Sequence, residues 1–477
     1  MSRQSDRIQT LSSVIRGKAD ISWREQLRMV VALSVPSILA QVSTVFMEYI
    51  DASMVGHLGA EASAAIGLVA SSTWLFFGLC SAAALGFSVQ VAHLLGAGKP
   101  DAARSVLRQS LVATLIFSIT ISLVGFCVGG SLPEWLGGDS AICGNSSRYF
   151  RLFVLFMPAL QLSYLAGGML RSSGNMLVPG VLSVLMCVLD IIFNFFLIFP
   201  TREVSVLGME LTIPGAGMGV SGAAVGTGLA VIVSTAVLLW YLWNRGGELK
   251  LSGTVGKYKP TLSCVCKAFK IGFPMGIERI VSTGAQITLT AIVAPLGICS
   301  IAANALAITA EGICYMPGYG IGEAATTLVG QSLGAGRKSL ARKFARTTIF
   351  LGVAVMTVMG VIMFVAAPLM IGLMTPDSAI VSLGSDVLRI EALAEPMFAA
   401  SIVAYGVFVG AGDTFYPCMM NLGSIWIIRV TLAAILAPIY GLYGVWIAMC
   451  AELCCRGIMF LIRFKYGSWM ARAEKLK

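Results

Sequence analysis

The sequence predicts an all-α integral membrane protein, with twelve transmembrane helices arranged as two pseudo-symmetric six-helix bundles. Composition is the first reason: 57% of the 477 residues are hydrophobic, only 12% are charged, and the mean hydropathy is +0.86. Soluble domains carry about 25% charged residues, so this composition indicates a lipid environment. An internal repeat is the second reason, because it divides the chain into two similar halves.

Apolar stretches long enough to cross a membrane recur along the whole sequence. A helix needs about 20 apolar residues to span a hydrocarbon core of about 30 Å. Counted between polar breaks, the expected spans are residues 31–54, 62–92, 106–130, 150–170, 179–199, 219–243, 271–293, 301–328, 347–371, 390–410, 418–437 and 442–464. The sequence therefore predicts a multi-pass membrane protein.

Basic residues are concentrated in alternate connecting segments. The net charge is +10, and Lys and Arg gather before the first span, after the second, in the linker at 244–270 and in the tail. The intervening loops hold few of them. Because cytoplasmic loops carry such an excess of basic residues, we expect a cell (inner) membrane protein with both termini cytoplasmic. Nucleic acid is not an expected partner.

Residues that enzymes and metal sites commonly need are scarce. Only two histidines occur, His57 and His93, and the chain lacks the HExxH, GxSxG and Gly-Lys-Ser/Thr motifs. Most of the twelve cysteines lie in apolar spans, where a free thiol behaves as a small hydrophobic group. The sequence therefore predicts no enzymatic activity, no cofactor and no structural metal.

One constant offset relates the two halves of the chain. A shift of 238 residues carries "LGAGKPDAAR" at 95–104 onto "LGAGRKSLAR" at 333–342. Further along, "GVSG" at 219–222 matches "GLYG" at 441–444 with an offset of 222, so the first half has 16 extra residues in its last outer loop. A register that holds over so many positions indicates a true structural repeat.

The repeat also predicts how the two bundles are arranged. Six spans per half is an even number, so both bundles start on the same side of the membrane and are related by an axis along its normal, as in parallel-repeat transporters. Two such bundles facing each other enclose a central cleft. The expected division is a cytoplasmic segment at 1–30, an N-lobe at 31–243, a linker at 244–270, a C-lobe at 271–464 and a tail at 465–477.

Four segments resemble the multidrug and toxic compound extrusion (MATE) family. They are "DASMVGHLGAEASAAIGL" (51–68), "LLGAGKPDAAR" (94–104), "TLVGQSLGAGRKSLAR" (327–342) and "GVFVGAGDTFYP" (406–417). The resemblance implies an antiporter that exchanges cytoplasmic organic cations or xenobiotics for external H⁺ or Na⁺. It also leaves an alternative, because the wider superfamily includes lipid-linked oligosaccharide flippases.

The resemblance also implies an ion-coupling site in the N-lobe. The acid of the family's first helix falls on Asp51, and the polar pair of its fifth helix falls on Asp190 and Asn194. In one branch of the family this pair is Asn then Asp, and here the order is inverted. The threonine of the sixth helix falls on Thr227. A family glutamate in the seventh helix is not assigned to Glu278, which lies about one turn away.

These residue types support the same site on physical grounds. A charge at mid-bilayer costs about 2.5–3.5 kcal/mol and usually marks a functional group. Asp190 and Asn194 are four residues apart, hence on one helix face. Together with Asp51 they could give oxygen ligands to Na⁺ or carry a proton, although they could instead only hydrogen-bond neighbouring helices. Glu48, three residues before Asp51, is a further candidate, and the repeat equivalent of Asp51 is Leu289.

The second half and the aromatic residues provide candidates for substrate binding. Glu311 lies inside the eighth span near Tyr315 and Tyr319, and such rings can bind flat cations. The other candidates are Trp74, Phe77 and Trp426. For each of these residues ordinary packing is the alternative, including a pairing of Glu311 with a buried Arg. Arg429 is expected to pair with an acid of its own lobe, because an unpaired buried Arg is costly.

The expected partners follow from these assignments. They are a small xenobiotic or organic cation and the lipid bilayer, and nothing in the sequence requires more than a monomer. The flippase alternative predicts a cationic central cavity, whereas the candidate polar residues are mainly acidic. Near the basic linker, Glu278 and Arg279 could also extend to the cytoplasmic membrane surface.

Overall fold

The computed structural model describes residues 11, 13–17, 21–206 and 209–472. Within this part, ten helices are individually long and apolar enough to cross a membrane, and two bent helix pairs raise the number of spans to twelve. The structure therefore confirms the predicted fold class.

Both bundles contain the predicted spans in the predicted order. The first consists of α2 (Trp23–Gly56), α3 (Ala60–Gly96), α4 (Pro100–Val128), α5 (Leu132–Trp135), α6 (Ser140–Leu155), α7 (Met157–Ser172), α8 (Leu177–Ile198) and α9 (Val220–Arg245). After η1 (Gly247–Leu249), the second consists of α10 (Leu262–Val293), η2 (Ala294–Leu296), α11 (Ile298–Gly334), α12 (Lys338–Gly372), α13 (Ser378–Ala392), α14 (Glu395–Gly410), α15 (Phe415–Gly423), η3 (Ser424–Val430), α16 (Thr431–Tyr440), α17 (Leu442–Tyr466) and α18 (Trp469–Arg472).

Each bundle has its own apolar core. One buried cluster joins α3, α4, α7 and α9 in the first bundle and extends to Cys264 and Ala268 at the start of α10. Another joins α11, α12, α13 and α17 in the second. Between the bundles, α2 packs against α11 and α3 packs against α10, which is the pairing that a two-fold repeat requires.

The fourth and tenth spans are bent at equivalent places. Helices α6 and α7 meet at 46°, and α13 and α14 meet at 57°. Pro158 and Pro396, 238 residues apart, lie in the first turn of the second helix of each pair. Proline lacks the N–H that would continue the preceding helix. The predicted single spans at 150–170 and 390–410 were too short, because each pair begins further back, at Ser140 and Ser378.

The eleventh span contains a π-helical segment. Ser424–Val430 separates α15 from α16 and carries Trp426 and Arg429. The equivalent stretch of the first bundle, within α8, is regular α-helix and carries Asp190. Short π-helical segments are rare and often occur at functional positions. The two halves therefore differ in backbone geometry at the same place where they differ in polar residues.

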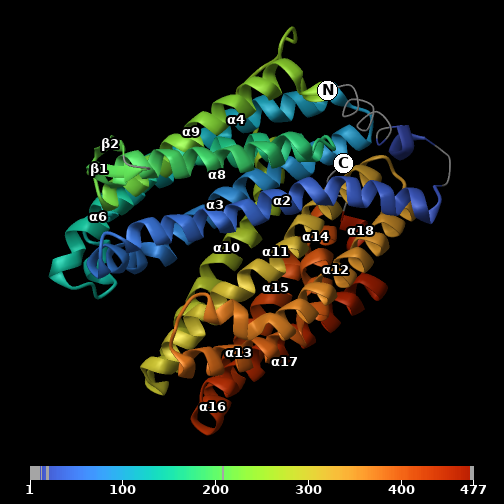
Figure 1. The fold of residues 1–477 in the computed structure, drawn as a ribbon. Coiled ribbons are helices and arrows are strands. Elements are labelled where there is room, and N and C mark those ends of the chain that lie inside the picture. Colours follow the sequence, from blue (N-terminus) through green and yellow to red (C-terminus); the bar gives the residue numbers. More distant parts are fainter. Residues whose placement is uncertain (1–10, 12, 18–20, 207–208, 473–477) are drawn as a thin grey trace.

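The extra residues of the first half form a small sheet. β1 (Pro200–Val206) and β2 (Met209–Ala216) pair in antiparallel fashion between α8 and α9. This hairpin lies at the end of the first bundle (Figure 1). The chain is thus not purely helical, and the repeat offset changes where the hairpin is inserted.

The two bundles form a V. They meet near α18 and diverge toward the hairpin on one arm and α16 on the other (Figure 1). We call the meeting point, at the C-terminal ends of α3 and α11, the closed end.

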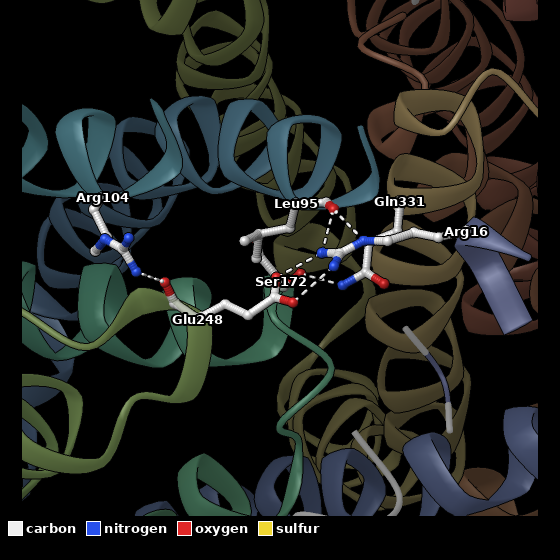
Figure 2. A network of polar contacts seen from close by, with 6 residues as sticks. All are labelled: Arg16, Leu95, Arg104, Ser172, Glu248 and Gln331. Atoms are coloured by element: carbon white, nitrogen blue, oxygen red, sulfur yellow. Dashed lines mark hydrogen bonds and ion pairs between the residues drawn. The ribbon is translucent and has the colours of Figure 1, made fainter. Parts of the chain in front are cut away.

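Two equivalent hydrogen bonds join the bundles at the closed end. Gln331 Nε2 of α11 donates to the carbonyl O of Ser172 at 2.6 Å (Figure 2). Its repeat equivalent, His93 of α3, has Nε2 2.7 Å from the carbonyl O of Gly410. A Cβ at Gly96 would overlap the carbonyl O of Gln331, so only glycine permits the helices to approach this closely.

A short N-terminal segment also connects the bundles at the closed end. We call residues 11 and 13–17 the N-terminal clasp. Arg16 donates to the carbonyl O of Leu95 through Nη2 at 2.7 Å and to Glu248 Oε2 at 2.6 Å (Figure 2). On the second bundle, Arg337 Nη1 donates to the carbonyl O of Val14 at 2.6 Å. The clasp therefore contacts both bundles and the connection between them.

Apolar contacts anchor the same segment. Leu11 and Ile15 are buried in a cluster with Leu328, Leu340 and Phe344 of the second bundle. Burying such side chains stabilises a contact by about 1.5–3 kcal/mol each, so the clasp is held by more than its polar groups.

Candidate ion-coupling and substrate site

Three of the predicted coupling residues meet inside the first bundle. Asp51 comes from α2, while Asp190 and Asn194 lie one turn apart on α8. Asn194 Nδ2 donates to Asp51 Oδ1 at 2.7 Å and to Asp190 Oδ2 at 3.1 Å. Asp190 and Asn194 are completely buried. Two carboxylates thus share one amide group; Asp190 is shielded from solvent, while Asp51 is only partly buried.

Two oxygens of this cluster lack a partner. Asp190 Oδ1 and Asn194 Oδ1 are buried and accept no hydrogen bond from any described residue. An unsatisfied buried polar atom costs about 1–3 kcal/mol, and more when it is charged. A proton would neutralise one carboxylate, and a Na⁺ ion would bind the free oxygens. Either species would therefore reduce the free-energy cost of burying these groups.

The other two predicted coupling residues lie at the edge of the cluster. Thr227 of α9 lies beside the Asp190 carboxylate. Glu48 lies three residues before Asp51 on α2 and interacts with it electrostatically. Glu48 also lies in the neighbourhood of Tyr315 of α11.

The described residues contain no group of three or more His, Cys, Asp or Glu side chains placed to hold a metal ion. A Na⁺ ion at Asp51 and Asp190 would therefore depend on the amide of Asn194 and the hydroxyl of Thr227 for its remaining oxygen ligands. Such a mixed set of hard oxygen donors suits an alkali cation better than a transition metal.

Two residues of this region were missed by the sequence analysis. A Cβ at Gly226 would overlap Asn194 Oδ1, so glycine makes room for the bridging amide. Tyr149 of α6 interacts electrostatically with both Asp51 and Asp190. Gly226 follows Gly222 by four residues in an apolar helix, and this spacing is typical of close helix packing. Tyr149 lies far away in sequence and gives no local signal.

The acids of the second bundle are deeply buried. Glu311 lies inside the bundle and interacts with Glu391 and Glu395. The carboxylate oxygens of Glu391 and Glu395 have no hydrogen-bond partner among the described residues. No ion pair joins Glu311 to an arginine in that part of the chain, so the predicted pairing alternative does not hold there.

Arg429 pairs with an acid of its own lobe, as predicted. Its Nη2 lies 2.7 Å from Glu452 Oε2, and its Nε lies 3.0 Å from the same oxygen. Arg456 Nε lies 3.1 Å from the other oxygen of Glu452. Both arginines are mostly buried, and their shared carboxylate compensates part of the charge.

Glu278 faces the interior of the second bundle. Tyr405 Oη donates to it at 2.8 Å and Asn421 Nδ2 at 2.7 Å. The interpretation that Glu278 extends to the membrane surface is therefore wrong, because both oxygens bind inside the bundle.

The predicted substrate-binding aromatics lie in three separate places. Tyr315 and Tyr319 pack edge to face on α11 with ring centroids 5.8 Å apart. Trp74 and Phe77 are neighbours on α3 at 5.9 Å. Trp426 donates from Nε1 to the carbonyl O of Val281 on α10 at 3.3 Å. The structure thus forms two aromatic pairs and leaves Trp426 apart from both.

The family profile named MatE matches residues 36–196 and 274–435, once in each half of the chain. The chain belongs to the MatE family. The two matches start 238 residues apart, which is the offset of the internal repeat. MatE membership makes this protein a multi-pass membrane transporter and not an enzyme.

Curated relatives resemble the chain over almost its full length. A probable multidrug resistance protein NorM of Thermotoga maritima is 25% identical over 93% of each chain. The protein of the same name from Neisseria meningitidis serogroup B is 26% identical over 90% of this chain and 92% of its own. An uncharacterized transporter of Bacillus subtilis, YisQ, is 23% identical over 90% and 91%.

Solved MATE structures share the fold. A MATE protein crystallised in a straight conformation superposes with a TM-score of 0.84 at 19% identity, over 98% of both chains. A multidrug resistance MATE family transporter in an outward-facing conformation gives 0.85 at 20% identity, again over 98% of both. These identities are low, so they establish the twelve-helix architecture alone.

Proposed function

We propose that this MatE protein is a secondary active transporter that exports organic cations or related xenobiotics in exchange for H⁺ or Na⁺. The observation that carries the proposal is the buried cluster in which Asn194 bridges Asp51 and Asp190 while two further oxygens stay unpartnered. The names of the NorM relatives, which refer to multidrug resistance, support export of small molecules.

The coupling step follows from the electrostatics of this cluster. Two carboxylates with one shared amide repel one another in a low-dielectric interior. A proton or a Na⁺ ion binding at Asp51, Asp190, Asn194 and Thr227 removes that repulsion and strengthens the contact of α2 with α8 and α9. Ion binding therefore changes the relative stability of two arrangements of the N-lobe. Alternating access results when substrate favours the arrangement that the ion disfavours.

The proposed topology places the closed end in the cytoplasm of a cell with the protein in its inner membrane. The excess of basic residues in the segments at that end supports this orientation. With both termini cytoplasmic, the diverging ends of the bundles face outward. We further propose the lobe division at 31–243 and 271–464, joined by the basic linker 244–270, in a monomer.

Substrate is proposed to bind between the bundles. Tyr315, Tyr319 and Trp426 are the aromatic candidates of the C-lobe, and Trp74 and Phe77 those of the N-lobe. Their rings offer faces for flat cations, and Glu48 adds a negative charge that interacts with Tyr315. Glu311 would act from inside the C-lobe bundle.

Efflux measurements with coupling-site variants test this function. Everted vesicles containing wild type, Asp51→Asn or Asp190→Asn are given a fluorescent cation in the medium, and its entry into the lumen, which corresponds to export from the cell, is followed under a pH gradient alone and under a Na⁺ gradient alone. We expect wild type to respond to one gradient and both variants to lose that response. Glu134→Gln, an exposed carboxylate in α5, is the control and should behave as wild type. Undiminished gradient-driven efflux by both aspartate variants would refute the coupling site.

A further inference from the structure

Arg279 extends from the second bundle toward the first. It lies on α10, and a Cβ at Gly78 of α3 would come within 2.8 Å of its Cγ. The stem of the arginine therefore packs against the opposite bundle, where a glycine makes room for it. The Arg279 side chain is nonetheless exposed at the surface of the protein. A charged group that lay against lipid in this span would be costly, so we place Arg279 on the surface between the bundles.

Three tyrosines lie in the neighbourhood of this guanidinium. They are Tyr164 of α7, Tyr319 of α11 and Tyr405 of α14. Within the described residues, no carboxylate forms an ion pair with it and its side chain makes no hydrogen bond. The adjacent Glu278 contributes to its field, but both Glu278 oxygens are bound by Tyr405 and Asn421. Arg279 thus has a negative neighbour and no direct partner.

The internal repeat gives independent support for the position of Arg279. The equivalent residue of the first bundle is Gln41 on α2, and it also reaches across, donating from Nε2 to Glu323 Oε1 of α11 at 3.3 Å. Glu323 in turn lies 3.7 Å from Arg171 Nε. The repeat therefore directs both side chains toward the opposite bundle, but only Gln41 meets a partner there.

We propose that Arg279 binds a carboxylate group on the transported molecule. The inference rests on the proposed export function and narrows its substrate class to aromatic compounds that carry both a cationic amine and a carboxylate. A guanidinium presents two parallel N–H donors that match a carboxylate, and such charge-assisted pairs are about twice as strong as neutral hydrogen bonds. Tyr319, which is exposed and packs against Tyr315, supplies a ring face for the aromatic part. The cationic amine follows from the proposed export of organic cations.

Binding of two matched dyes tests this assignment. A rhodamine with a free carboxylate and the methyl ester of the same rhodamine differ in one charged group. Fluorescence polarisation with purified protein in detergent gives Kd for each dye without any ion gradient, so the result does not depend on whether the proposed coupling is correct. We expect wild type to bind the acid more tightly than the ester. Arg279→Gln should weaken acid binding by about tenfold while ester binding stays the same.

Further variants separate charge, geometry and folding. Arg279→Lys keeps the charge but loses the paired donors, so it should bind the acid with intermediate affinity. Gly78→Ala displaces the arginine stem and should also weaken acid binding selectively. Arg24→Gln, an exposed arginine at the start of α2, is the control and should match wild type. Unchanged ester affinity shows that a variant is folded.

Three results would overturn the proposal. In the first, wild type binds the acid and the ester equally. In the second, Arg279→Gln keeps the wild-type preference for the acid. In the third, Arg279→Gln weakens binding of both dyes to the same extent. The dye-binding result is separate from the efflux result. If wild type prefers the acid and Arg279→Gln loses this preference, but no efflux occurs under ion gradients, the carboxylate-binding site stands and the transport mechanism needs revision.

Discussion

Asn194 holds together two carboxylates that come from different helices. Its amide donates to both Asp51 and Asp190, so it fixes their separation and leaves one oxygen of each α8 residue free. The neutral amide cannot cancel either charge. The cluster is therefore suited to gain and lose a small cation, and a structural role alone would not require two acids.

Gly226 is essential to this geometry. In Gly226→Ala the new Cβ would overlap Asn194 Oδ1, and overpacking of this kind usually costs about 1–3 kcal/mol. We expect the amide to shift, gradient-driven efflux to be lost and the thermal unfolding midpoint in detergent to fall. Gly67→Ala on α3 is the matched control, since its added Cβ meets nothing within 4 Å. Equal efflux by both alanine variants would show that the position of Asn194 does not matter for coupling.

At the scale of helices, the sequence already contained the cause of the two bends. Pro158 and Pro396 were visible at equivalent positions, and the structure breaks each span just before them. The π-helical segment at Ser424–Val430 and the hairpin were not predictable in the same way. The first carries Arg429, which bonds to Glu452 of α17, and no local sequence pattern marks it. The second appeared only as a change in repeat offset.

Loss of the contacts of the N-terminal clasp should destabilise the closed end. Arg16→Ala removes its bonds to Leu95 and Glu248, and a charge-assisted hydrogen bond contributes about 1.5–3 kcal/mol. The ion pair is partly exposed and adds less. We expect amide hydrogen exchange at residues 90–98 and 328–336 to accelerate by about tenfold, because exchange follows local opening.

A charge exchange gives a sharper version of this test. In Arg16→Glu alone, the backbone amides at the closed end should exchange fast. Adding Glu248→Arg rebuilds the ion pair without the Leu95 contact, so it should restore part of the protection of these amides. Arg24→Ala, exposed in α2, should leave exchange unchanged. If Arg16→Ala and Arg16→Glu both keep wild-type protection at the closed end, the clasp does not hold the bundles together.

Across the whole molecule, the two bundles are joined where the repeat places equivalent groups. His93 with Gly410 and Gln331 with Ser172 are the same contact made twice. Opening of the closed end must break both and release the clasp from at least one bundle. The loss of these bonds is the cost that ion and substrate binding must offset, so the conformational balance depends on the closed end as well as on the Asp51 cluster.

The sequence predicted the architecture better than the site. Periodic apolar runs and the 238-residue repeat determine the number and order of spans, because both are properties of the chain itself. Asp51, Asp190, Asn194 and Thr227 were named from a family resemblance, and the structure brings them together. Which groups stay unpartnered, such as Arg279, depends on contacts between distant helices that no local pattern encodes.

The central claim is that ion entry through the Asp51 cluster is exchanged for substrate exit. Proteoliposomes loaded with a fluorescent organic cation that the protein transports, and with a lumenal dye for H⁺ or for Na⁺, are diluted into cation-free buffer without an ion gradient. The account predicts that wild type admits one of the two ions in proportion to the organic cation released, and that Asp190→Asn admits neither. Release of the organic cation by wild type without entry of either ion, or equal ion entry in Asp190→Asn, would contradict it.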